Sequence, residues 1–217
     1  VYGAIGNTAK TETSELNPLS AYAKSKVNAE EGLSKLNAGD TIITCLRFAT
    51  ACGMSQRLRL DLVLNDFIAS AMSTKKINIL SDGSPWRPLI NVKDMARAMH
   101  WAILREENNG GKFLICNTGS NSWNYTVKEL AERVQSHFSD IQVSVNPDAP
   151  ADKRSYKVNF DYFTSLAGQY TPIYDLDKTI VELINGLNSI HFEDADFRNS
   201  SLMRLNVLNQ FLSKDQL

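Results

Sequence analysis

The sequence predicts an α/β fold, in which a parallel sheet carries helices on its faces and a mostly helical part follows. Three observations predict this class. Strand-like runs alternate with segments of helical period over residues 20–145. Residues 41–48 are rich in β-branched side chains and almost uniformly apolar, which is typical of a strand buried in a parallel sheet. With 217 residues and a 43% hydrophobic share, the chain can also bury a sizeable core.

The N-terminal elements follow from turn residues and helical spacing. Residues 3–19 are rich in Gly, Thr, Asn and Pro and predict a loop. A helix is predicted over 20–36, because apolar residues recur there at three-to-four spacing, Ser20 can cap it and Gly39 follows it. The buried strand 41–48 comes next.

The alternation of helices and strands continues to residue 145. Helices are predicted over 61–73, 93–105 and 126–138, and strands over 76–80, 88–92, 112–117 and 142–145. Asn109-Gly110-Gly111 predicts a turn, and Thr126 with Glu129 is a capping-box pattern. From residue 159 onward, three further helical segments are expected near 160–168, 177–187 and 201–212, with no further strand.

The composition argues against several function classes. A formal net charge of -1 provides no field for a nucleic acid or an anionic membrane surface. No apolar stretch approaches the roughly 18–20 residues of a membrane span. Cys45, Cys52 and Cys116 form no CxxC pair and predict reduced core thiols in a cytoplasmic protein. The three histidines share no ligand spacing, so no metal site is expected.

Tyr22 and Lys26 lie four residues apart, hence one turn apart on one face of the predicted helix. A free phenol, with a pKa near 10, is a poor base at neutral pH, and an adjacent ammonium stabilises its ionised form. Such a tyrosine could exchange a proton with a substrate while a hydride moves, and the lysine could donate to cofactor ribose hydroxyls. Spacing alone does not select this pair, because Tyr174 and Lys178 have the same spacing. A tyrosine and a lysine at this spacing are more often a packed ring and a solvated ammonium than a catalytic pair.

The sequence around Tyr22 favours the catalytic interpretation. The segments that support this interpretation are, in chain order, Val1-Tyr2-Gly3, Asn17-Pro18-Leu19-Ser20-Ala21-Tyr22-Ala23-Lys24-Ser25-Lys26, Leu46-Arg47-Phe48, Gly53 and Arg87-Pro88-Leu89-Ile90-Asn91-Val92-Lys93-Asp94-Met95-Ala96-Arg97-Ala98. Together they resemble the extended short-chain dehydrogenase/reductases, the NAD(P)-dependent epimerases and dehydratases of nucleotide sugars. The resemblance extends from Val1 to about Leu187. It implies the C-terminal portion of a Rossmann-type parallel sheet with a smaller mixed α/β substrate domain.

The resemblance also implies domain bounds. Residues 1–56 would be the second half of the NAD(P)-binding Rossmann domain, with 89–118 returning to it, and 57–88 and 119–217 would form the substrate-binding C-terminal domain. The nearest match to a phosphate loop, Gly3-Ala4-Ile5-Gly6, has no strand before it and no helical period after it. In the family that loop precedes the VYG segment, so we expect it upstream of Val1, and this chain to correspond to the C-terminal part of such an enzyme.

Site residues are carried over position by position. Tyr22 and Lys26 match the catalytic pair of the family. Tyr22, Lys26 and Ala49 match positions that contact the cofactor. The positions that match substrate contacts are Thr50, where many members have Asn, and Arg57, Arg59, Asn65, Arg87 and Arg154. Arginine suits a diphosphate, because its planar fork donates two hydrogen bonds. As alternatives, Arg57 and Arg59 could be solvated loop charges, and Arg154 could pair with Asp152.

The resemblance implies an enzyme that oxidises or reduces a nucleotide-activated sugar, with NAD or NADP as cofactor. We favour the epimerase and dehydratase group. A nucleotide-sugar 4-ketoreductase shares the same segments, and a non-catalytic or truncated member serving as a binding scaffold is an alternative of another class. The expected partner is the nucleotide sugar, with neither nucleic acid nor membrane, and family resemblance implies a homodimer.

Overall fold

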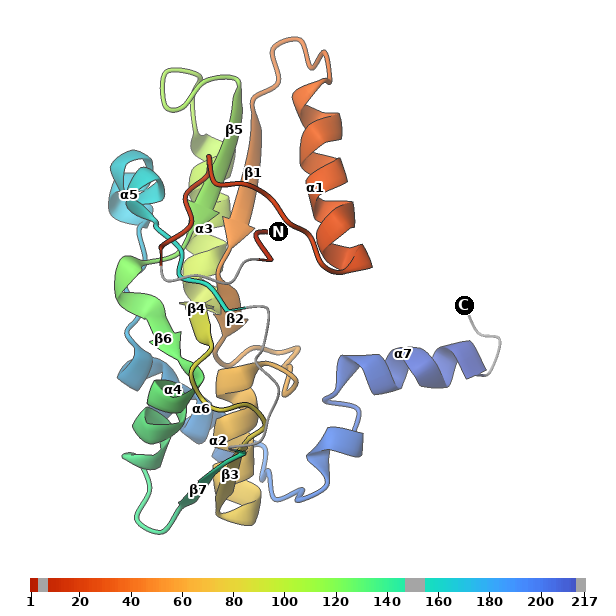
Figure 1. Cartoon of the computed structure of the whole chain (residues 1–217), viewed down its shortest axis with the longest axis vertical. Coiled ribbons are helices and arrows are strands. Elements are labelled where there is room, and N and C mark those ends of the chain that lie inside the picture. Colours follow the sequence, from red (N-terminus) through yellow and green to blue (C-terminus); the bar gives the residue numbers. More distant parts are fainter. Residues whose placement is uncertain (4–7, 147–154, 214–217) are drawn as a thin grey trace. The chain divides into compact units, whose positions relative to one another are not determined.

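The structure is a computed structural model that describes residues 1–3, 8–146 and 155–213. The chain folds into two compact units, whose elements are shown in Figure 1. Unit 1 comprises Val1–Ala51, Pro85–Thr126 and Pro150–Ile173, and unit 2 comprises Cys52–Ser84, Val127–Ala149 and Tyr174–Leu217. The functional assignment of a Rossmann portion and a substrate domain stays a prediction.

A parallel strand pair organises unit 1. The elements around it are α1 (Ala21–Ser34), β1 (Ile43–Phe48), α3 (Val92–Leu104), β5 (Phe113–Thr118), α5 (Asp161–Ala167) and the 3-10 turns η1 (Asn121–Trp123) and η2 (Gly168–Tyr170). β1 and β5 pair in parallel, from Ile43 opposite Phe113 to Phe48 opposite Thr118. Leu114 and Cys116 of β5 lie in one buried cluster with Trp101 of α3 and Phe163 of α5. This parallel arrangement with packed helices confirms the predicted α/β class (Figure 1).

A second sheet contains two strands that the sequence did not predict. β4 (Trp86–Asn91) lies between β2 (Thr50–Cys52) and β6 (Asn124–Thr126), and its pairing with β6 is antiparallel. β2 and β6 are three residues long, too short to show an alternating pattern, and they are defined by their pairing with β4. Ile90 of β4 belongs to a buried cluster that also includes Ala49 and Phe160.

The described part of unit 2 contains four α-helices and a two-stranded parallel sheet. Its elements are α2 (Val63–Thr74), β3 (Lys76–Ile79), α4 (Val127–Gln135), β7 (Gln142–Val145), α6 (Leu176–Ser189), η3 (Phe197–Asn199) and α7 (Arg204–Ser213). β3 pairs with β7 in parallel, with Ile77 opposite Val143. The fully buried side chains of this unit include Leu64 and Ile68 of α2 together with Leu130, Ile180 and Leu183. All predicted helices of both units are present.

Two predictions of burial need correction. The run 41–48 predicts a fully buried strand, but each of the six residues of β1 is only half-buried. Among the described strands, β5 is the one that pairs with β1, whereas a strand buried in a parallel sheet has neighbours on both sides. Cys45, on β1, is therefore a half-buried thiol, whereas Cys52 and Cys116 are buried. None of the helices in the described part of the chain has the length and hydropathy to cross a membrane.

Candidate active site

The first turns of α1 bring the predicted catalytic pair together. The Ser20 side-chain oxygen accepts a hydrogen bond from the Ala23 N–H at 3.1 Å, which caps the helix as predicted. One turn apart on this helix, the Lys26 Nζ lies 5.4 Å from the centroid of the Tyr22 ring. The Tyr22 side chain is 73% exposed, and neither it nor the Lys26 ammonium hydrogen-bonds to another described side chain. Both groups are thus accessible to a ligand.

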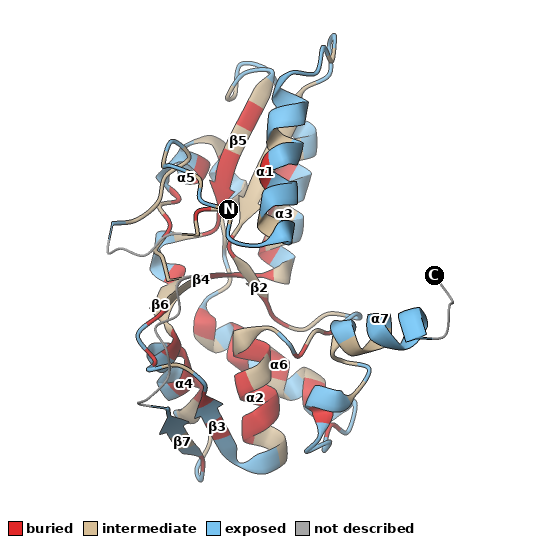
Figure 2. Cartoon of the chain, turned by 45° about the vertical axis from the view of Figure 1, so that its right-hand side comes forward, coloured by how far each residue is buried: buried red, intermediate tan, exposed pale blue. Residues whose placement is uncertain are grey.

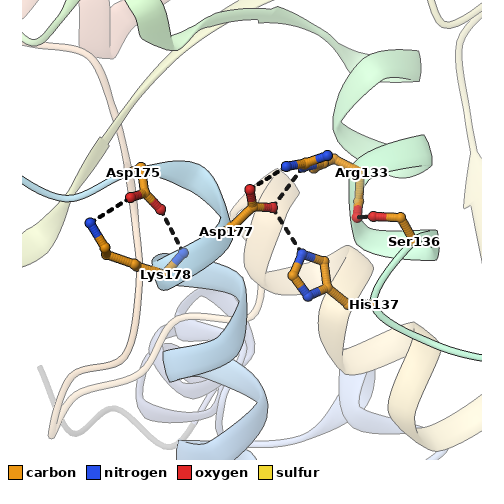
Figure 3. A network of polar contacts seen from close by, with 6 residues as sticks. All are labelled: Arg133, Ser136, His137, Asp175, Asp177 and Lys178. Carbon is orange, nitrogen blue, oxygen red and sulfur yellow. Dashed lines mark hydrogen bonds and ion pairs between the residues drawn. The ribbon is translucent and has the colours of Figure 1, made fainter.

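The rival pair has a different environment. Tyr174 precedes Asp175, the N-cap of α6, and therefore lies outside the helix that carries Lys178. The Lys178 Nζ pairs with the Asp175 carboxylate at 2.7 Å, as Figure 3 shows, and the Lys178 N–H donates to the same carboxylate at 2.8 Å. The hydrogen bond to Asp175 raises the pKa of Lys178. Lys178 therefore pairs with the N-cap residue of α6. The Tyr22–Lys26 and Tyr174–Lys178 pairs have the same spacing but different surroundings.

Ala49 and Thr50 lie where β1 ends. The Ala49 N–H donates to the Thr118 carbonyl oxygen at 3.0 Å, which joins the ends of β1 and β5, and the Ala49 side chain is buried. Thr50 begins β2 and is half-buried. The main chain here is held by the sheet, so a ligand would meet a rigid strand end.

Arg87 lies on β4, also in unit 1. It is half-buried, opposite Tyr125 in the pairing with β6, and its Nη1 donates to the Trp86 carbonyl oxygen at 2.9 Å. The Lys157 Nζ lies 3.8 Å from the centroid of the Trp86 ring. Sequence reasoning missed Lys157, because nothing in its own neighbourhood indicates that it approaches β4.

Three other predicted residues belong to unit 2. Arg57 is exposed, and the Arg59 guanidinium donates to both Asp61 carboxylate oxygens, at 3.0 and 2.6 Å. These bonds lower the pKa of Asp61. The Asn65 side chain is buried, accepts from the Gly53 N–H at 3.1 Å and donates to the Arg59 carbonyl oxygen at 2.9 Å. The Asn65 amide therefore holds the loop before α2. A substrate role for Arg57, Arg59 and Asn65 stays a prediction.

Arg154 lies outside the described residues, so its predicted role has no structural counterpart here. Within residues 1–3, 8–146 and 155–213, no group of three or more His, Cys, Asp or Glu side chains is arranged to hold a metal ion.

Comparison with known proteins identifies the family. A family model described as the NAD dependent epimerase/dehydratase family matches residues 1–116. The chain belongs to this family. The resemblance predicted from the ordered segments is thereby confirmed, and the family is NAD-dependent by its description.

Solved structures of epimerases and dehydratases have the same fold. MoeE5 in complex with UDP-glucuronic acid and NAD matches at a TM-score of 0.73 and 22% identity, over 88% of this chain and 62% of MoeE5. TunA, an NAD-dependent NDP-hexosamine 5,6-dehydratase of tunicamycin biosynthesis, matches at 0.72 and 20% identity, over 90% of this chain and 62% of TunA. The UDP-glucuronic acid 4-epimerase from Bacillus cereus matches at 0.67 and 20% identity, over 88% and 59%.

This chain thus spans 62% of the length of MoeE5 and 62% of the length of TunA. The predicted fold, an α/β portion of a Rossmann-type structure, is confirmed by these matches.

Proposed function

We propose that the protein is an NAD-dependent epimerase or dehydratase of a nucleotide-activated sugar, with Tyr22 as its acid/base. The observation that carries the proposal is the accessible Tyr22–Lys26 pair at the capped start of α1, in a chain of the NAD dependent epimerase/dehydratase family. The proposal includes the Rossmann assignment of 1–56 and 89–118, the substrate-domain assignment of 57–88 and 119–217, and a cytoplasmic homodimer.

The residues of α1 have distinct roles in this proposal. When bound, NAD would supply the redox chemistry, which is hydride transfer at a sugar carbon. The Tyr22 phenolate takes the proton of the hydroxyl on that carbon as the carbonyl forms, and the phenol returns it in the reverse step. The Lys26 ammonium stabilises the phenolate and donates to ribose hydroxyls of the cofactor. Ala49, at the end of β1, is among the residues that would hold the cofactor.

Arginine side chains are proposed to hold the nucleotide. Arg87 offers a half-buried guanidinium on a sheet strand, so little side-chain freedom remains to be lost when it binds a diphosphate. Thr50, Arg57, Arg59, Asn65 and Arg154 complete the proposed set of substrate contacts. UDP-sugars in the MoeE5 complexes support a nucleotide sugar as the substrate class.

The proposal is tested by turnover and one substitution with a matched control. The native protein that carries this sequence is incubated with NAD and either UDP-glucose or UDP-glucuronic acid, and the products are separated by anion-exchange chromatography. Tyr22→Phe should lower turnover by at least about 10², the low end for general acid/base catalysis. Its melting temperature should stay unchanged, because the ring is exposed.

Tyr174→Phe is the control, and we expect its turnover to stay within a few-fold of wild type, since Tyr174 lies outside α6. Equal losses in the two variants would contradict the role of Tyr22. Absence of any NAD-dependent conversion of either sugar would contradict the proposed function.

A further inference from the structure

The helix that carries Tyr22 and Lys26 has little apolar packing. Of the fourteen residues of α1, Val27 alone is buried, and Figure 2 shows most of this helix as exposed. Within the described residues, the apolar burial of α1 thus rests on the Val27 side chain. A directional polar contact also joins α1 to β1.

Glu30 supplies that contact. It lies one turn after Lys26, and its carboxylate accepts two hydrogen bonds from Arg47 of β1, Nε to Oε1 at 2.9 Å and Nη2 to Oε2 at 2.6 Å. The Arg47 and Glu30 side chains are only 8% and 12% exposed. A buried bidentate pair constrains both the distance and the angle between its partners, so it fixes α1 along its axis and in rotation.

The guanidinium of Arg47 is itself held on its far side. Its Nη1 donates to the Tyr2 hydroxyl at 2.9 Å, and that hydroxyl donates to the Asn117 side-chain oxygen of β5 at 2.5 Å. The Asn117 N–H donates to the Glu12 carboxylate at 2.8 Å. Burial alone would lower the pKa of Arg47, but its bonds to Glu30 and Tyr2 outweigh burial and raise it. The cation is therefore permanent and anchored to β1 and β5.

We propose that Glu30 and Arg47 are positioning residues for the catalytic pair. This inference rests on the proposed function, and it adds residues that do not touch the substrate. An α-helix is stiff and rises 1.5 Å per residue, so Glu30 lies about 12 Å along the axis from Tyr22 and transmits its own placement. Since misplacement by about 1 Å can cost about 10²-fold in rate, the Glu30–Arg47 pair determines turnover through Tyr22.

Turnover of the native protein with UDP-glucuronic acid or UDP-glucose tests the positioning. Glu30→Gln keeps the shape but loses the charge, and we expect kcat to fall at least tenfold while KM stays within about threefold. Glu31→Gln is the matched control, because Glu31 is the exposed neighbour on the same helix and should keep kcat within about twofold. Arg47→Lys, which keeps the charge without the fork, should reproduce the loss in kcat.

A double-substitution cycle separates positioning from a general effect on folding. If Glu30 acts through Tyr22, Glu30→Gln should cost less than about twofold in a Tyr22→Phe background, since the group to be positioned is gone. Equal fold-losses in both backgrounds would overturn the proposal. If Glu30→Gln does not fold, Glu30→Asp, which keeps the charge on a shorter side chain, takes its place in the same cycle.

Backbone hydrogen exchange tests the anchor without any substrate. In Glu30→Gln, peptides covering 21–34 should exchange at least tenfold faster than in wild type or Glu31→Gln, while peptides covering 92–104 stay unchanged. Equal protection of 21–34 in all three proteins would overturn the anchor. If wild type converts no nucleotide sugar, the proposed function fails, and the exchange experiment still decides whether the pair holds α1.

Discussion

Gly119 directly follows β5, and its missing side chain makes room for a buried aromatic ring. A Cβ at this position would lie 2.7 Å from Cε1, 2.8 Å from Cζ and 3.1 Å from Cδ1 of Phe160. Phe160 is fully buried and belongs to the same cluster as Tyr2 and Ala49, beneath the end of β1. Gly119→Ala therefore inserts one methyl group into the core that includes Ala49, a proposed cofactor contact.

The cost of Gly119→Ala follows from these distances. Carbon atoms pack best at about 3.5–4.0 Å, so the Phe160 ring would have to retreat by about 1 Å within a close-packed interior. Such overpacking costs about 1–3 kcal/mol of stability. The φ of Gly119 lies outside the left-handed region, so backbone strain adds nothing. Gly32→Ala in α1 is the control: no atom lies within 4 Å of its Cβ, and we expect a gain of about 0.5–1 kcal/mol.

Urea unfolding followed by tryptophan fluorescence measures this difference. All three tryptophans, Trp86, Trp101 and Trp123, lie in unit 1, so the signal reports on the unit that contains Gly119. Leucine lacks the clashing ring atoms, so Gly119→Ala should cost less than about 0.5 kcal/mol in a Phe160→Leu background. A cost that persists unchanged in that background would refute the assignment of the clash to the ring.

Two further predictions concern binding and pH. Arg87→Lys should weaken UDP binding about tenfold in calorimetric titration without changing NAD affinity, because the fork is lost, and unchanged UDP binding would make Arg87 structural. Hydrogen bonds from Arg133 and His137 lower the pKa of Asp177 (Figure 3), so it contributes stability above its unfolded value of 3.8, lost as pH falls through the folded pKa. Burial raises the pKa of Asp66 more than Arg198 lowers it, so wild type loses stability as pH rises through that pKa. In urea unfolding at about pH 6, Asp177→Asn should be less stable than wild type by under about 1 kcal/mol, and Asp66→Asn should be at least as stable as wild type. Both differences in stability should vanish in acid. A stabilised Asp177→Asn together with a destabilised Asp66→Asn at about pH 6 would refute this link between pKa and stability.

The regular elements of the fold could be predicted from periodicity. α3 and α6 repeat apolar residues over several turns, and β5 begins with the apolar run Phe113-Leu114-Ile115-Cys116, so local pattern and final structure agree. β2 and β6 could not be predicted, since a three-residue strand has no period of its own and exists through its neighbour β4. The half-burial of β1 could not be predicted either, because an apolar run does not record how many strands will flank it.

In the candidate site, too, residues related by a local spacing could be predicted and residues brought together by the fold could not. Tyr22 and Lys26 were predictable because a four-residue spacing on a capped helix determines their proximity. The same rule failed to distinguish Tyr174 and Lys178, yet Asp175 supplies a local signal that could have done so. An Asp three residues before Lys178 is a helix N-cap pattern, which places Tyr174 before the helix begins.

The Glu30–Arg47 contact has no such local signal. Seventeen residues separate the two side chains along the chain, and 115 separate Tyr2 from Asn117, so no helical or strand period relates them. They meet because β1 pairs with β5 and because Glu30 of α1 reaches Arg47 of β1, and both contacts exist only in the folded chain. A spacing motif thus specifies which groups share one helix face, but it leaves open where that helix is held. In the proposal, the buried Glu30–Arg47 pair outside the motif supplies that information, and substitutions at Glu30 or Arg47 are expected to affect turnover through the placement of Tyr22.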